Sequence, residues 1–247
     1  MAELLLQAHQ IIRRWGGVVA VDRVSIELMR GEVHAVIGTN GAGKSTLINI
    51  LSGEIPPSGG SVELLGQDVT GWTQPKRARA GLGRSYQRNT IYPTFTVFEN
   101  CRLAAQARTQ KPWHWWQDAQ ACDASTTAAR QAAAEAGLTE LLERPAGLLS
   151  HGQKRQLEIA MCLATAPEVL LLDEPLAGMG AEETERMLAL LAELRAEHAI
   201  LLVEHDMDAV FRIADRITVM VNGCVIASDT PDAIRTNPQV QSAYLGH

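Results

Sequence analysis

Eight consecutive residues have the composition of a loop that binds phosphate. They fit the pattern G-x-x-x-x-G-K-[ST] and run through Gly38, Thr39, Asn40, Gly41, Ala42, Gly43, Lys44 and Ser45. Glycines let the backbone bend tightly and bring its N–H groups close to an anion, because no side chain intervenes. An apolar-periodic stretch over residues 44–51 predicts a helix directly after the loop, and its unpaired N–H groups would face the same anion. The pattern therefore predicts a site for nucleotide phosphates.

Two side chains of this loop have expected chemical roles, and Thr46 is expected to join the nucleotide contacts. Lys44 would reach the β- and γ-phosphates, and the hydroxyl of Ser45 would be a ligand of Mg²⁺. The alternative is a glycine-rich turn with an incidental lysine. A strand expected over residues 32–37 and the helix that follows the loop both favour the phosphate site.

Two adjacent acids, Asp173 and Glu174, follow a short run of wholly apolar residues at 169–172. Such a run is typical of a strand buried on both faces of a parallel sheet. Ligands of open α/β sheets bind beyond the carboxyl ends of the strands, so we expect Asp173 to hold Mg²⁺, usually through water, and Glu174 to polarise the attacking water. Acids after a strand can also cap a turn, but the phosphate loop elsewhere in the chain favours the catalytic interpretation.

A second anion-binding helix start is expected at Ser150 and Gly152, just before a helix with apolar positions at Leu157, Met161 and Ala164. Its unpaired N–H groups and dipole would attract negative charge. One chain with two such helix ends makes sense if the second serves a nucleotide held by another subunit.

The residues Leu149, Ser150, His151, Gly152 and Gln153 resemble the LSGGQ signature of ABC ATPases. His151 stands where the family has the first glycine of the pair. The signature precedes the strand that ends in two acids, as the family requires. This resemblance implies nucleotide contacts from Ser150, Gly152 and Gln153.

Three further residues match family positions in the expected order along the chain. Gln87 matches the Q-loop glutamine, His205 matches the switch histidine, and Trp15 resembles the aromatic residue that stacks on adenine. Each has a simpler alternative: a solvated polar side chain for Gln87, a helix cap for His205 and an ordinary core position for Trp15. The order of the motifs, rather than the residue types, supports the functional interpretation.

The resemblance implies that two subunits enclose two ATP molecules. Each site would join residues 38–46 of one chain to residues 150–153 of the other. Mg²⁺ would be surrounded by Ser45, Gln87 and Asp173. The catalytic group would consist of Glu174, His205, Gln87 and Lys44.

Several segments resemble one subgroup, the importers of branched-chain and other hydrophobic amino acids, with urea and amide relatives. These segments lie at residues 15–17, 83–87, 176–178 and 230–246. Gly180 departs from the family, which has Asp or Asn there. The alternatives are an ATPase of lipopolysaccharide export, a soluble ABC ATPase of DNA repair or translation, and a nucleotide-dependent scaffold without turnover.

The order of the expected elements predicts an α/β fold. Strands are expected at 24–29, 32–37, 61–65, 169–172 and 200–203, helices over most of 97–142 and over 182–197, and a hairpin at 217–227 around Asn222 and Gly223. With the resemblance, this order predicts a P-loop ATPase core with a mostly parallel sheet, an N-terminal antiparallel β subdomain and an inserted α-helical subdomain. A single ABC ATPase domain would span 1–247, with the core and β subdomain at 1–87 and 165–247 and the helical subdomain at about 88–164.

The composition limits the possible partners. The net charge of −6 argues against a nucleic-acid partner, which would require a basic surface. The four cysteines lack metal-ligand spacing, so free thiols are expected. We expect no signal peptide and no membrane span. The family implies a second ABC ATPase subunit, identical or paralogous, transmembrane permease subunits, indirectly a periplasmic or extracellular substrate-binding protein, and a peripheral location on the cytoplasmic face of the inner or plasma membrane.

The segment Trp113, His114, Trp115 and Trp116 has two interpretations. Packing within a helical insertion is the favoured one. Contact with a permease or with the membrane interface is the alternative, because tryptophan is enriched at such borders.

Overall fold

The computed structural model describes residues 3–86, 90–109 and 123–245. Two predictions fall outside these residues: the role of Gln87 and the alternatives for residues 113–116. The described residues form two compact units. The first comprises the chain up to Arg84, Glu168–Glu174 and the chain from Arg195 onward, and the second comprises Ser85–Pro167 and Pro175–Leu194.

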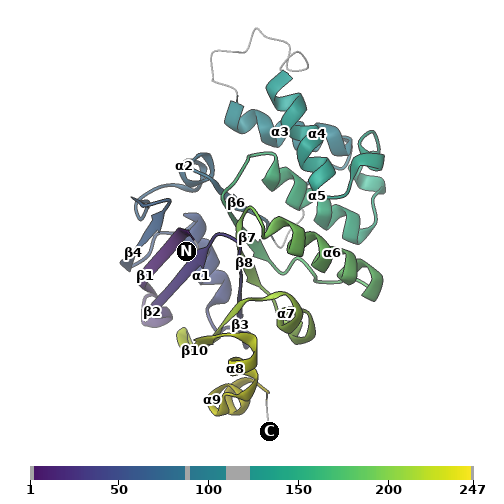
Figure 1. Ribbon diagram of the computed structural model, residues 1–247. Helices are drawn as coiled ribbons and strands as arrows, with labels where there is room; N and C mark the ends of the chain where they lie inside the picture. Colours follow the sequence, from purple (N-terminus) through teal and green to yellow (C-terminus); the bar gives the residue numbers. More distant parts are fainter. Residues whose placement is uncertain (1–2, 87–89, 110–122, 246–247) are drawn as a thin grey trace. The chain divides into compact units, whose positions relative to one another are not determined.

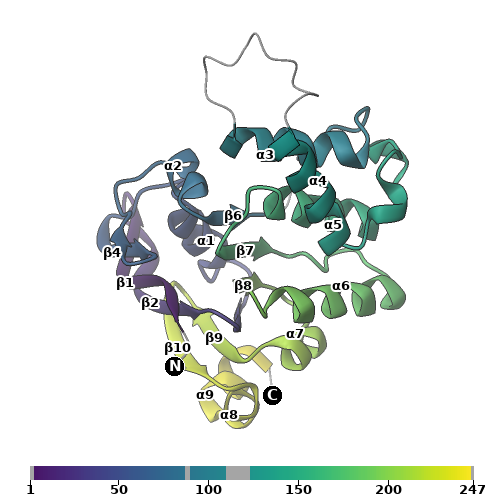
Figure 2. The same cartoon turned by 45° about the horizontal axis from the view of Figure 1, so that its top comes forward.

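The first unit contains a six-stranded sheet in the order β10-β9-β3-β8-β7-β6. Its strands are β3 (Val33–Gly38), β6 (Leu82–Arg84), β7 (Val169–Asp173), β8 (Ala199–Val203), β9 (Arg216–Val221) and β10 (Cys224–Asp229). All neighbours pair in parallel except β9 and β10, which form the predicted antiparallel hairpin. Every residue of β3, β7 and β8 is buried, which confirms that the two apolar runs are strands covered on both faces. In Figures 1 and 2, β6, β7 and β8 lie side by side.

A second, antiparallel sheet has the order β2-β1-β4-β5. It consists of β1 (Leu4–Trp15), β2 (Val18–Met29), β4 (Gly59–Leu64) and β5 (Gln67–Asp68). The N-terminal antiparallel β subdomain is thus confirmed, but β1 was not expected. The register of β1 against β2 shifts several times, and Gln10 has a positive φ of 50°. These bulges break the alternation of apolar and polar residues by which a strand is recognised. The strand expected at 24–29 is β2, which begins six residues earlier, at Val18. The same register shifts obscure the alternation in this added part of β2.

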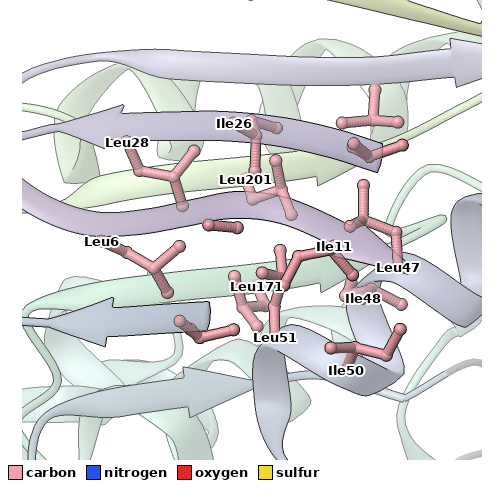
Figure 3. Packing of buried hydrophobic residues seen from close by; sticks show 14 of the residues in the cluster. Leu6, Ile11, Ile26, Leu28, Leu47, Ile48, Ile50, Leu51, Leu171 and Leu201 are labelled. Atoms are coloured by element: carbon pink, nitrogen blue, oxygen red, sulfur yellow. The ribbon is translucent and has the colours of Figure 1, made fainter. Parts of the chain in front are cut away.

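A hydrophobic core of the first unit joins residues of the two sheets. Leu6 and Ile11 of β1 and Ile26 and Leu28 of β2 are buried, with at most 4% of their surface exposed. They pack with α1 residues such as Leu51 and with strand residues of the parallel sheet, as Figure 3 shows. Burial of such side chains contributes about 1.5–3 kcal/mol each. This core fixes the helix that follows the phosphate loop.

The helices of the first unit are short. They are α1 (Lys44–Ser52), α2 (Gln74–Arg79), α7 (Met207–Ile213), α8 (Pro231–Thr236), α9 (Pro238–Val240) and the π-helix η4 (Gln241–Leu245). The buried side chain of Arg77 in α2 donates hydrogen bonds to the carbonyl oxygens of Ile50 and Leu51, 2.8 and 2.7 Å away. It thereby satisfies carbonyl groups at the end of α1 that have no partner within the helix.

The second unit is helical. Its segment Ser85–Pro167 overlaps the inserted subdomain expected at about 88–164, whereas Pro175–Leu194 was expected within the core at 165–247. It contains α3 (Val97–Thr109), α4 (Asp123–Glu135), the 3₁₀ turns η2 (Thr139–Leu141) and η3 (Ala146–Leu148), α5 (His151–Leu163) and α6 (Ala181–Leu194). The helix expected over residues 182–197 is α6, which ends three residues earlier. In the ranges that the structure covers, no helix has the length and apolar composition needed to cross a bilayer.

Candidate functional site

The phosphate loop joins β3 to α1, and close backbone contacts require its glycines. A Cβ atom on Gly38 would lie 2.2 Å from the carbonyl oxygen of Met220, and one on Gly43 would lie 2.3 Å from that of Ala20. Gly43 also adopts a left-handed φ of 101° and is the N-cap of α1. No side chain of the described residues caps this helix start, so its N–H groups face an incoming anion.

The side chain of Lys44 lies across the loop. Its Nζ donates hydrogen bonds to the carbonyl oxygens of Gly38, at 2.7 Å, and Thr39, at 3.2 Å. Burial lowers the pKa of Lys44, while the negative charges of Glu174 and Asp173 act in the opposite direction. The ammonium group therefore bonds to the loop carbonyl oxygens and is subject to the negative charge of both acids.

The rest of the loop is open to solvent. Its exposed residues are Thr39, Asn40, Gly41 and Ser45. Ala42 is buried, and its carbonyl oxygen accepts a hydrogen bond of 2.9 Å from the N–H of Gly223 in the β9–β10 turn. The β9–β10 hairpin was predicted from Asn222 and Gly223. Its hydrogen bond to the phosphate loop was not predicted from the sequence.

The two acids emerge at the edge of the sheet where the phosphate loop begins. In the strand register Asp173 pairs with Val203, and Val203 pairs with Val36, two residues before Gly38. Asp173 is buried. Glu174 adopts a left-handed conformation with φ 51°, and its N–H donates to the carbonyl oxygen of Val203 at 2.8 Å. Non-glycine residues seldom adopt this conformation, and such strain concentrates at functional sites.

His205 follows β8 and lies beside Glu174. Its Nδ1 is 4.0 Å from Oε1 of Glu174 and 3.7 Å from Oε2 of the buried Glu204. The His205 side chain is 62% exposed. The alternative interpretation of His205 as a helix cap is wrong, because Asp206 is the N-cap of α7 and accepts a hydrogen bond from the N–H of Ala209.

Trp15 ends β1, and its alternative interpretation as a core residue is wrong, since 51% of its surface is exposed. The guanidinium group of Arg13 stacks on the Trp15 ring. Trp15 pairs with Val18, two residues before Ala20, whose carbonyl oxygen faces Gly43 of the loop. The exposed ring is therefore on the hairpin that adjoins the phosphate loop.

In the second unit, the signature-like segment forms the start of α5. Ser150 is the N-cap: its Oγ accepts a hydrogen bond from the N–H of Gln153, and the Gln153 side-chain oxygen accepts one from the N–H of Ser150 at 3.0 Å. This reciprocal pair is a capping box. Gln153 therefore has its amide oxygen engaged at the start of the helix.

The family is shown by comparison with known sequences. The profile of a family described as "ABC transporter" matches residues 21–177, and a profile described as "Branched-chain amino acid ATP-binding cassette transporter" matches residues 224–247. The chain belongs to the ABC transporter family. It is an ATP-binding cassette, the ATPase subunit of such transporters.

Relatives match the chain over its whole length. It is 40% identical to the high-affinity branched-chain amino acid transport ATP-binding protein BraF of Pseudomonas aeruginosa, with 100% of this chain and 99% of the relative covered. The identity and coverage are the same for LivG of Escherichia coli K12, which has the same description.

Solved ABC cassettes have the same fold. A nucleotide-free ATP-binding cassette from an ABC transporter superposes with a TM-score of 0.87 at 29% identity, covering 99% of this chain and 100% of the other. The ADP conformation of an ATP-binding cassette gives a TM-score of 0.85 at 29% identity, covering 99% of both chains. The fold is therefore that of an ABC cassette, and nucleotide binding is a property of this class.

Two residues depart from the ABC patterns, and the structure shows the contacts of His151. Its Nε2 lies 2.9 Å from the carbonyl oxygen of Ala177. A Cβ on the neighbouring Gly178 would lie 3.2 Å from the same nitrogen. At the second departure, Gly180, a Cβ would meet no atom within 4 Å in the described residues, so nothing steric requires glycine there.

The sequence did not identify two side chains that contact predicted site residues. Arg13 contacts Trp15, and Glu183 contacts Ser150 and Gly152. Residues two apart share a face of a regular strand, but no strand was expected at Arg13 and Trp15, and the register shifts at Arg13 interrupt the alternation there. Glu183 is 33 residues from Ser150, and no sequence spacing indicates that contact.

Proposed function

We propose that this ATPase energises the import of branched-chain or other hydrophobic amino acids, or of urea or amides, through partner permeases. The observation that carries the proposal is the full-length similarity to the branched-chain amino acid transport proteins, together with the match at residues 224–247. The phosphate loop and the acids at one sheet edge support the ATPase chemistry within the chain.

The nucleotide contacts in this proposal come from both units. The adenine stacks on Trp15, and the phosphates lie against Lys44 and the backbone of residues 38–46. Ser150, Gly152 and Gln153 contact a nucleotide bound to a second ABC ATPase subunit, identical or paralogous. The anion-binding character of both helix starts supports this arrangement.

Glu174 accepts a proton from the attacking water, and His205 holds the γ-phosphate in place. The position of the His205 ring beside Glu174 supports this division of roles. Release of the phosphate then frees the contacts that hold two subunits together, so ATP acts as a ligand that favours the closed state.

The residues at the sheet edge fit a magnesium ion. Ser45 offers an exposed hydroxyl and Asp173 a carboxylate, and Mg²⁺ prefers such oxygen ligands. Gln87, outside the described residues, is the third proposed ligand. When bound, Mg²⁺ would neutralise charge on the phosphate oxygens.

The chain, a single ABC ATPase domain over residues 1–247, acts as a peripheral protein on the cytoplasmic face of the inner or plasma membrane. There it binds transmembrane permeases that receive solute from a periplasmic or extracellular binding protein, with no nucleic acid involved. The net charge of −6 supports the last point.

Reconstitution tests the proposed function. The chain is purified with its permeases, placed in vesicles with the binding protein, and ATP-dependent uptake of labelled leucine, urea and acetamide is measured. We expect uptake of at least one solute with the wild type. We expect none with Glu174→Gln, which keeps ATP binding but abolishes turnover and traps a dimer. Undiminished phosphate release by Glu174→Gln, or ATP-driven export without uptake, would contradict the proposal.

A further inference from the structure

The carboxylate of Glu183 lies at the start of two helices at once. It accepts a hydrogen bond of 3.0 Å from the hydroxyl of Ser150 and one of 3.2 Å from the N–H of Gly152, both at the start of α5. It also accepts a hydrogen bond from the N–H of Gly180, the residue before α6. One side chain therefore receives donors from two helix starts.

The electrostatics of this position favour a negative charge. Helix starts carry a partial positive charge from their unpaired N–H groups. The hydrogen bond from Ser150, followed by those from Gly152 and Gly180, lowers the pKa of Glu183. The carboxylate is therefore ionised at neutral pH and occupies the start of α5 as an anion would.

A helix cap accounts for only part of these contacts. A glutamate at the third position of a helix commonly bonds to the N–H of the residue before that helix, and the contact with Gly180 is of this kind. The bonds to Ser150 and Gly152 belong to a different helix. The approach is close: a Cβ on Gly152 would lie 2.8 Å from the Glu183 carboxylate, so a larger residue at position 152 would displace that carboxylate.

The carboxylate borders a pocket of about 340 Å³. Its polar lining includes Ser150, Gln153, Gln156, Glu183 and Arg186. The pocket therefore offers space, hydrogen-bond donors and the positive charge of Arg186. Glu183 occupies two of the donors, the hydroxyl of Ser150 and the N–H of Gly152.

We propose that Glu183 is a specificity-determining residue of the nucleotide site shared between subunits. Its carboxylate occupies the donors of Ser150 and Gly152 until the γ-phosphate of a nucleotide on the second subunit displaces it. A γ-phosphate brings more negative charge to these donors than a carboxylate does, whereas ADP has no γ-phosphate. The exchange therefore selects ATP over ADP as the ligand that closes the dimer. This inference rests on the proposed function.

The test measures dimerisation in the hydrolysis-blocked background Glu174→Gln. Light scattering gives the ATP and ADP concentrations at half-dimerisation with and without the further change Glu183→Gln, which keeps the shape of the side chain and removes its charge. Hydrogen bonds to charged groups are stronger than neutral ones, so we expect Glu183→Gln to lower the ATP concentration at half-dimerisation by about tenfold. With ADP the carboxylate stays on these donors and its negative charge repels the phosphates of the nucleotide, so removing that charge should also increase dimerisation with ADP, which leaves the parent monomeric.

The neighbouring Glu182→Gln is the matched control. It removes the same charge, but the Glu182 side chain is 86% exposed and pairs with Arg186 within α6. We expect this control to dimerise at the ATP concentration of the parent. If Glu183→Gln does not fold, Glu183→Asp replaces it, because the shorter side chain reaches the α5 donors poorly and should shift dimerisation in the same direction.

The other outcomes separate the two proposals. If the parent dimerises with ATP but Glu183→Gln needs the same or a higher ATP concentration, Glu183 is a structural cap and this inference is wrong. If the parent itself stays monomeric with ATP, the proposed function fails and this inference fails with it.

Discussion

The guanidinium carbon of Arg13 lies 3.8 Å from the centroid of the Trp15 ring. A hydrogen bond of 2.8 Å from Arg13 Nη1 to the carbonyl oxygen of Pro56 holds the arginine in this position. The pair is a cation–π interaction, and 51% of the Trp15 surface remains exposed. Arg13 therefore orients the ring that we propose to stack on adenine.

This arrangement predicts that Trp15→Ala weakens ATP binding about tenfold, since stacking of a base on an aromatic ring contributes about 1–3 kcal/mol. Arg13→Ala should weaken it about two- to fivefold, and this effect should vanish in a Trp15→Ala background. Calorimetric titration measures all four affinities. Arg14→Ala, which removes the same charge from the next residue, is the control. Tighter binding by Arg13→Ala would show that the arginine occupies the place of the base.

The loop glycines provide a second prediction. Gly41 and Gly43 both have a positive φ, 78° and 101°, but a Cβ on Gly41 would meet no atom within 4 Å in the described residues, whereas one on Gly43 would meet the Ala20 carbonyl oxygen. Gly41→Ala should cost about 1–2 kcal/mol of unfolding free energy from backbone strain alone. Gly43→Ala should cost at least about 2 kcal/mol more, because strand β2 has to move. Equal costs in urea unfolding would contradict the packing of the loop on β2.

The buried His34 predicts a dependence of stability on pH. It is 2% exposed, its Nδ1 lies 3.0 Å from the carbonyl oxygen of Glu27, and its Nε2 lies 2.8 Å from the hydroxyl of Thr218. Burial lowers the pKa of His34 from 6.5 to about 4. The histidine is therefore neutral in the folded protein, whereas the unfolded chain binds a proton below pH 6.5. The stabilisation that comes from the neutral, buried His34 is complete above pH 6.5. It is lost as the pH falls from 6.5 toward 4.

The loss amounts to about 3 kcal/mol of unfolding free energy between pH 7 and pH 4. Urea unfolding of the wild type and of His34→Gln at several pH values measures this loss. Both proteins contain the same carboxylates, so the pH dependence of the carboxylates cancels when one unfolding free energy is subtracted from the other. The advantage of the wild type should shrink as the pH falls. An advantage that stays constant with pH would contradict the assignment to His34.

The sequence predicted the elements whose signals are local. The apolar runs 169–172 and 200–203, the phosphate loop and the Asn222–Gly223 turn each carry a pattern within a few residues, and the strands, loop and hairpin follow it. The strand β1 was missed because bulges interrupt its alternation. The contact of Glu183 with Ser150 was missed because it depends on how α5 and α6 pack, which no spacing along the chain records.

Complementation between two inactive chains tests the central claim, the nucleotide site shared between subunits, most directly. Lys44→Ala removes the phosphate-loop lysine, and Ser150→Ala removes the hydroxyl of the opposite subunit. Each variant alone should lack ATPase activity. If sites are shared, mixing the two creates mixed dimers with one intact site, and about a quarter of all sites should be intact in an equal mixture. ATPase activity of the mixture clearly above that of either variant is the predicted result. An equal mixture that remains as inactive as its components would contradict the shared site.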